Sequence, residues 1–199
     1  LNSSDSPVFN KSENLFGIDN VRGGLKNFPF VVLCEGYFDV IAMFQNGFET
    51  AVASLGTSVT EKQMELMSRF NKPVVIFLDG DDAGRKAAKK IVKLDLPEKI
   101  DLRVALIKNK EEDPDSILQK KDGQETVKQL IELARPLFQE ILDEQIELYN
   151  GTENLEEKIK IEKEIRKTAE RIPFIKKRTY NLYIQKKTSN AIKISYNRN

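Results

Sequence analysis

Two apolar runs that each end in a carboxylate and a glycine constrain the fold of this chain most strongly. Residues 30–39 read FVVLCEGYFD and residues 74–84 read VVIFLDGDDAG. Short apolar runs rich in Val, Ile and Phe and closed by glycine are typical of parallel strands that are covered on both faces. Functional sites in such sheets lie outside the carboxyl ends of the strands. The two runs therefore predict a sheet with acidic side chains along one edge.

The order of the remaining patterns predicts an α/β fold followed by helices. Strands are expected at 30–34, 51–53, 73–79 and 102–107, with helices between them, which indicates an open parallel sheet with right-handed crossovers. A helix capped by Ser12 is expected before the first strand, and Thr60 with Gln63 forms a capping box before the helix that runs to about residue 70. From Ser116 onward only helical patterns occur, and they lie at 116–121, 124–149, 154–171 and 174–188. We therefore expect a domain boundary near residue 122.

Composition removes several classes of function. The 199 residues include one cysteine, Cys34, and no histidine, which excludes a disulfide framework and a zinc cluster within this sequence. Acid–base or metal chemistry must then come from carboxylates, Lys, Tyr or water. The sequence has no Walker-type loop, no stretch of about 18 apolar residues and no signal peptide. These observations predict a cytoplasmic protein without a membrane partner, and the initial Leu1 suggests a piece of a longer chain.

Charge is distributed unevenly along the chain. Residues 158–199 contain 13 Lys and Arg against 3 Asp and Glu, although the whole chain has a net charge of +1. Tyr180 and Tyr183 lie within this basic stretch, which suits a polyanion such as nucleic acid. A solvated helix face is the favoured interpretation of the same run. The sequence leaves both interpretations open.

Acidic residues follow three of the expected strands. Asp79 and Asp81 flank a glycine, so both carboxylates can face one cation. The alternative is a strand-to-helix turn in which Asp81 or Asp82 caps the helix that begins at Ala83. Glu35 closes the first strand and is a ligand or a proton-transfer group. A third acidic point, residues 113–115, follows the fourth strand, and its alternative is a solvated turn in which Asp115 caps the helix at Ser116.

Acids gathered at one edge are costly unless cations neutralise them, and Mg²⁺ or Mn²⁺ prefers oxygen ligands. Carboxylates, a divalent metal and no histidine point to phosphoryl or nucleotidyl transfer. Residues 54–57 offer hydroxyl groups, a glycine and backbone amides, which suit either a phosphate or a simple turn.

These motifs resemble those of a known superfamily. A Glu-Gly that closes one strand and an Asp-x-Asp that closes a later one are similar to the Toprim domain of bacterial primases, topoisomerases and some nucleases. The sequences EGYFD at 35–39, AVASLGT at 51–57, DGD at 79–81 and DPD at 113–115 resemble the DnaG-type replicative primase. Residues 2–3 and 7–11 also resemble the segment that precedes the Toprim fold in that family.

The resemblance implies roles for particular residues. Glu35, Asp79 and Asp81 would be the principal catalytic and metal-binding acids, with Asp39, Asp113 and Asp115 in the same cluster. The expected cofactor is Mg²⁺ or Mn²⁺, with no zinc in this chain. The residues expected to contact nucleotide or template are Lys11, Ser54, Gly56 and Thr57.

The same resemblance implies DNA-templated synthesis of RNA primers. The partners would be a single-stranded DNA template, ribonucleoside triphosphates, an RNA–DNA hybrid and, through a domain absent here, the replicative helicase. Residues 1–29 would end an N-terminal polymerase subdomain, 30–122 would form the Toprim domain and 123–199 a helical subdomain. The alternatives are a Toprim nuclease or topoisomerase, and a metal- and nucleotide-binding module without turnover. Primer synthesis by this segment alone is expected to be weak or absent.

Overall fold

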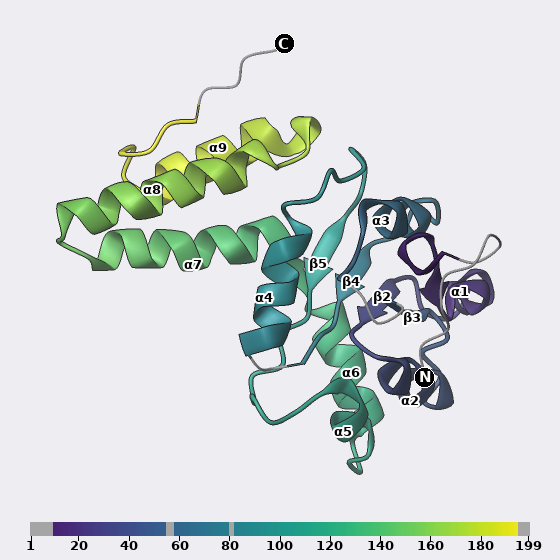
Figure 1. The fold of residues 1–199 in the computed structure, drawn as a ribbon. Helices are drawn as coiled ribbons and strands as arrows, with labels where there is room; N and C mark the ends of the chain where they lie inside the picture. The colour runs from purple at the N-terminus through teal and green to yellow at the C-terminus, as the bar shows by residue number, and fades with distance from the viewer. Residues whose placement is uncertain (1–9, 55–57, 80–81, 195–199) are drawn as a thin grey trace. The chain divides into compact units, whose positions relative to one another are not determined.

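The computed structural model describes residues 10–54, 58–79 and 82–194, and it forms two compact units (Figure 1). The first unit is Leu1–Pro136 and the second is Leu137–Asn199. Within the described residues, no helix is both long enough and apolar enough to cross a bilayer.

A six-stranded mixed sheet organises the first unit, in the order β1-β3-β2-β4-β5-β6. The four central strands are parallel, which confirms the predicted parallel sheet, and two short edge strands are antiparallel to their neighbours. Leu33 lies opposite Val52 on one side and Ile76 on the other. The strands are β1 (Leu15–Phe16), β2 (Val31–Cys34), β3 (Ala51–Ser54), β4 (Val74–Ile76), β5 (Leu102–Val104) and β6 (Arg135–Pro136).

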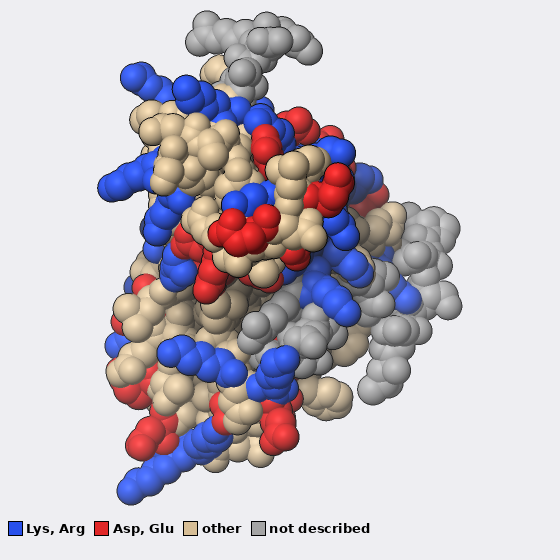
Figure 2. Space-filling model, turned by 90° about the vertical axis from the view of Figure 1, so that its left-hand side faces the viewer, with Lys and Arg blue, Asp and Glu red and all other residues tan. Residues whose placement is uncertain are grey.

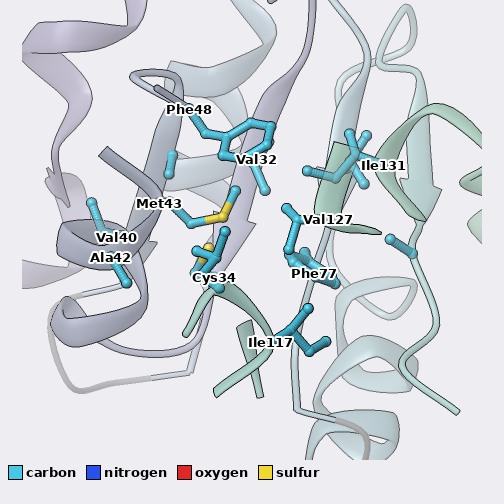
Figure 3. Packing of buried hydrophobic residues seen from close by; sticks show 14 of the residues in the cluster. Val32, Cys34, Val40, Ala42, Met43, Phe48, Phe77, Ile117, Val127 and Ile131 are labelled. Carbon is cyan, nitrogen blue, oxygen red and sulfur yellow. The ribbon is translucent and has the colours of Figure 1, made fainter. Parts of the chain in front are cut away.

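Helices cover both faces of this sheet. Alternate strand residues point to opposite faces, and Val32, Ala53 and Phe77 share one buried cluster with residues of α2, α5 and α6 (Figure 3). On the other face, Leu78 lines a pocket together with Ala87 of α4. The helices of this unit are α1 (Ile18–Gly24), α2 (Tyr37–Gln45), α3 (Glu61–Ser68), α4 (Asp82–Ile91), α5 (Pro114–Leu118) and α6 (Gly123–Glu132).

The N-terminal stretch differs from its prediction. Ser12 does not cap a long helix; instead Asn10 accepts a hydrogen bond from the Ser12 amide at 3.0 Å and caps a short 3₁₀ helix, Lys11–Glu13. Strand β1 follows, and Gly17, with φ of 81°, turns the chain into α1. Local hydrogen bonds of Asn and pairing of β1 with β3 therefore outweigh the helical pattern. The capping box of Thr60 and Gln63 is confirmed.

The expected helix at 124–149 is divided into two. Helix α6 ends at Glu132, and Arg135–Pro136 pairs with β5 before the next helix begins. Proline lacks an amide donor and disfavours helix in the residue before it, so the break coincides with Pro136. The first compact unit extends to Pro136, and Val127 and Ile131 of α6 pack into the core of the sheet.

Three helices form the second unit: α7 (Leu137–Gly151), α8 (Leu155–Glu170) and α9 (Phe174–Lys187). Leu142 of α7, Ile165 of α8 and Ile184 of α9 are fully buried. The side chain of Gln145 donates a hydrogen bond to Thr168 across α7 and α8 at 3.1 Å, and Tyr183 donates one to Asp143. This unit matches the predicted all-α subdomain.

We expect Gly17→Ala to lower the free energy of unfolding by about 2 kcal/mol or more, because a left-handed residue with a Cβ is strained and overpacked. The added Cβ would lie 2.7 Å from the Ala51 carbonyl oxygen. Gly23→Ala is the matched control, since nothing lies within 4 Å of its Cβ position. Urea unfolding of both variants checks this, and equal stabilities would contradict the assigned turn.

Candidate functional site

The candidate site lies at the point in the sheet where the crossover connections of two adjacent strands run to opposite sides. Strand β2 sits between β3 and β4. The helix after β2 returns to β3, whereas the helix after β4 leads to β5 on the opposite side. Such a reversal opens a crevice outside the carboxyl ends of the strands. Glu35, which is exposed, follows β2 directly, and the half-buried Asp79 follows β4 by three residues, so both border this crevice.

The turn after β2 is fixed by a side chain of the helix that follows it. Asp39 is only 8% exposed, and its Oδ2 accepts a hydrogen bond from the Gly36 amide at 2.9 Å. This bond satisfies one of the amides that a helix start leaves without an intrahelical partner. Glu35 thus remains directed toward solvent while Asp39 is held against the turn.

The predicted acids lie close enough to affect one another. Burial is the main cause that raises the pKa of Asp39, and the hydrogen bond from Gly36 partly opposes it. The charges of Asp113, Asp115 and Glu35 raise this pKa further. Carboxylates from the β2–α2 turn and from the start of α5 therefore share one region of negative potential.

Asp113, rather than Asp115, caps α5, which corrects the predicted cap. The Oδ1 of Asp113 accepts the Ser116 amide at 2.6 Å, and the Asp113 amide donates to the Ser116 hydroxyl at 2.9 Å. Asp115 lies in the first turn, where its Oδ2 accepts a hydrogen bond from Gln119 at 3.1 Å. Helix α5 starts two residues earlier than expected because Pro114 suits the first helical position.

The carboxylate of the neighbouring Glu112 is bound by Lys120 and Asn109. Hydrogen bonds from Lys120 at 2.6 Å and from Asn109 at 2.8 Å lower the pKa of Glu112. This carboxylate is therefore engaged in a surface ion pair.

Asp79 is held by a close approach of α4. Gly84 is buried, and a Cβ at this position would lie 2.3 Å from the carbonyl oxygen of Asp79. A glycine early in a helix that follows an acidic turn is a sequence signal for such an approach. Only glycine lets α4 begin this close to the backbone of Asp79.

Cys34 lies between the two acidic turns as a buried core residue. Burial, followed by the charges of Asp39 and Asp79, raises the pKa of its thiol well above the usual value. A thiol in this setting stays protonated and is a poor nucleophile.

A pocket of about 550 Å³ opens beside Glu35. Its lining includes Cys34, Ser54 and, from α4, Lys90. Ser54 was a predicted contact for nucleotide, whereas Lys90 was not singled out. The helical spacing of Ala87 and Lys90, which lie three residues apart on one face of α4, could have indicated it.

Other predicted residues lie apart from this pocket or outside the described residues. Gly56, Thr57 and Asp81 fall outside the described residues. The backbone carbonyl of Lys11 accepts a hydrogen bond from Gln63 at 2.9 Å, which places Lys11 beside the start of α3. A larger groove of about 720 Å³ lies between the β1–α1 stretch and α2 and is lined by Phe16, Ile41 and Phe44.

The donor set fits a hard divalent cation. Glu35 and Asp79 offer carboxylate oxygens, and the charges of Asp113, Asp115 and Glu35 add to burial in raising the pKa of Asp39. Among the described residues, no group of three or more Asp, Glu, Cys or His side chains could by itself hold a metal ion.

Part of the basic stretch in the second unit is paired on its own helix. Arg166 forms an ion pair with Glu162, and Lys167 forms one with Glu164 at 2.8 Å. Acidic and basic side chains are interspersed over the face seen in Figure 2. For these two residues the observation favours a solvated, internally paired helix face.

Comparison with known proteins gives consistent matches. Residues 32–118 match the family described as Toprim-like. The DNA primase of Aquifex aeolicus is 40% identical over 158 residues, which cover 79% of this chain and 30% of the relative. The structure of the zinc-binding and RNA polymerase domains of that primase has a TM-score of 0.76 at 35% identity and covers 94% of this chain and 44% of the other.

A second solved structure is the DnaG primase catalytic domain bound to single-stranded DNA. It has a TM-score of 0.81 at 27% identity and covers 95% of this chain and 60% of the other. The chain thus spans less than two thirds of the relatives that it matches.

The raised pKa of Asp39 predicts how the stability of the metal-free chain depends on pH. A carboxyl whose folded pKa exceeds its unfolded value binds its proton more tightly when folded, so its contribution is lost as pH rises through the folded pKa. We expect Asp39→Asn to flatten the decline in stability above about pH 4, the range of a free aspartate, and to be more stable than the wild type at pH 7. Urea unfolding between pH 4 and pH 7 measures this, and parallel profiles would contradict it.

Proposed function

We propose that this chain, which belongs to the DnaG-type primases through its Toprim domain, carries the nucleotidyl-transfer site that adds ribonucleotides to a primer on single-stranded DNA. The observation that carries the proposal is the placement of Glu35 and Asp79 at the ends of adjacent parallel strands, across the crevice of the sheet. The bound single strand in the DnaG catalytic domain supports the choice of template. The corresponding cellular location is the bacterial cytoplasm.

Toprim domains of primases bind divalent metal. For this chain we infer that Mg²⁺, or Mn²⁺ in its place, is held by Glu35, Asp79 and Asp81. Bound there, the cation would neutralise the phosphates, activate the attacking 3′ hydroxyl and stabilise the pyrophosphate that leaves. Asp113 and Asp115 add to the negative potential that attracts the ion.

The chain's own residues have separate tasks in this reaction. Glu35 is exposed at the crevice and can reach an ion or a reacting hydroxyl, whereas Asp79 is held by the approach of Gly84. Ser54 and Lys90 line the pocket beside Glu35, where a hydroxyl and an ammonium group suit the phosphates of a nucleotide. Lys11, Gly56 and Thr57 remain candidate contacts for nucleotide or template by their resemblance to the family.

Calorimetric titration of Mn²⁺ tests the proposed site. We expect saturable binding that tightens when a ribonucleoside triphosphate is added and that weakens at least about tenfold in Glu35→Gln and in Asp79→Asn, since each variant removes a charged ligand. Glu65→Gln is the matched control, because Glu65 pairs with Arg69 on the surface of α3.

Incorporation of labelled ribonucleotides on a single-stranded template measures the activity itself. Any incorporation by this chain should disappear in Asp79→Asn and persist in Glu65→Gln. Unchanged Mn²⁺ affinity in both site variants would contradict the proposal.

Gly84 provides a further test that changes no ligand. Gly84→Ala should displace the backbone of Asp79 and weaken Mn²⁺ binding about fivefold or more, because a shift of an ångström at a preorganised site is costly. Gly151→Ala is the control, as nothing lies within 4 Å of its Cβ position. The same calorimetry compares the two variants, and equal affinities would show that Gly84 does not position Asp79.

A further inference from the structure

The turn that presents Glu35 is very short. Strand β2 ends at Cys34 and α2 begins at Tyr37, so only Glu35 and Gly36 connect them. With so few residues, the backbone conformation at Gly36 decides the direction in which the Glu35 side chain leaves the sheet. A group that fixes Gly36 therefore also orients Glu35.

Asp39 is the side chain that contacts this turn. Its Oδ2 accepts the Gly36 amide at 2.9 Å, and a Cβ on Gly36 would lie 3.4 Å from the same oxygen. Gly36 stands at the N-cap of α2 but has no side chain that could cap the helix. Asp39, at the third helical position, supplies this link instead.

The exposure of the two acids also separates their roles. Asp39 is 8% exposed, and one of its oxygens is engaged by the backbone, whereas Glu35 is exposed at the crevice. Helix α2 packs against α5, because Met43 of α2 and Ile117 of α5 lie in the same buried cluster (Figure 3). Asp39 thus lies on a helix that is fixed in place by the hydrophobic core.

We propose that Asp39 is a positioning residue, which orients Glu35 through the hydrogen bond from Gly36 and does not itself coordinate the metal ion. The inference rests on the proposed function, because it requires Glu35 to bind metal. It assigns Asp39 a role different from the one that the family resemblance implied.

Two substitutions of Asp39 separate positioning from coordination. Asp39→Asn and Asp39→Ala remove the same charge, but only asparagine retains an oxygen that can accept the Gly36 amide. We expect Asp39→Ala to bind Mn²⁺ about fivefold to tenfold more weakly than Asp39→Asn, which is the effect of losing one hydrogen bond. Hydrogen exchange should show the Gly36 amide protected in the asparagine variant and unprotected in the alanine variant.

The same pair of variants in a Glu35→Gln background provides the control. Without the Glu35 carboxylate, Asp39 has no metal ligand to orient. The difference in Mn²⁺ affinity between the Asp39→Asn and Asp39→Ala variants should therefore vanish. A difference that persists would indicate a general structural effect and would overturn the inference. Equal affinities of the two variants with Glu35 present would overturn it as well.

The outcome for Glu35→Gln alone distinguishes the two proposals. If this variant binds Mn²⁺ as tightly as the wild type, the proposed metal site is wrong and the inference fails with it. If the variant binds weakly while Asp39→Asn and Asp39→Ala bind alike, the proposed site stands and only the positioning role of Asp39 is lost.

Discussion

Parallel pairing of β2 with a neighbour on each side is the constraint on which the rest of the first unit depends. All four residues of β2 are buried, and its backbone bonds to β3 and to β4. A strand covered on both faces and both edges has one available register, since a slip would expose its apolar side chains. The residues that follow it, Glu35 and Gly36, are therefore placed by the core rather than by local preference.

Hydrogen bonds within the fold partly compensate the negative charge at this edge of the sheet. Asp39 and Asp113 each accept an amide at the start of a helix, where the orphan amide groups favour a carboxylate. Glu112 is turned toward Lys120. Glu35, by contrast, is exposed at the end of β2, and Asp79 is half-buried after β4.

Much of this arrangement could be predicted from local patterns. The apolar runs that became β2 and β4 and the capping box at Thr60 follow directly from residue type and spacing. Predictions failed where a long-range partner competed with a local preference. Leu15 and Phe16 fit a helical pattern but pair with β3, and Arg135 and Pro136 interrupt a helical run because they pair with β5.

The sequence by itself limited the chemistry that this protein can support, since it contains 31 Asp and Glu but no histidine. It also determined that the acids follow buried strands. Only the tertiary structure decided which acids are exposed and which are engaged, because burial depends on how α2 and α5 pack against each other and on the sheet. The crevice also depends on the tertiary structure, because it arises from the position of β2 between β3 and β4. No local sequence pattern encodes this strand order.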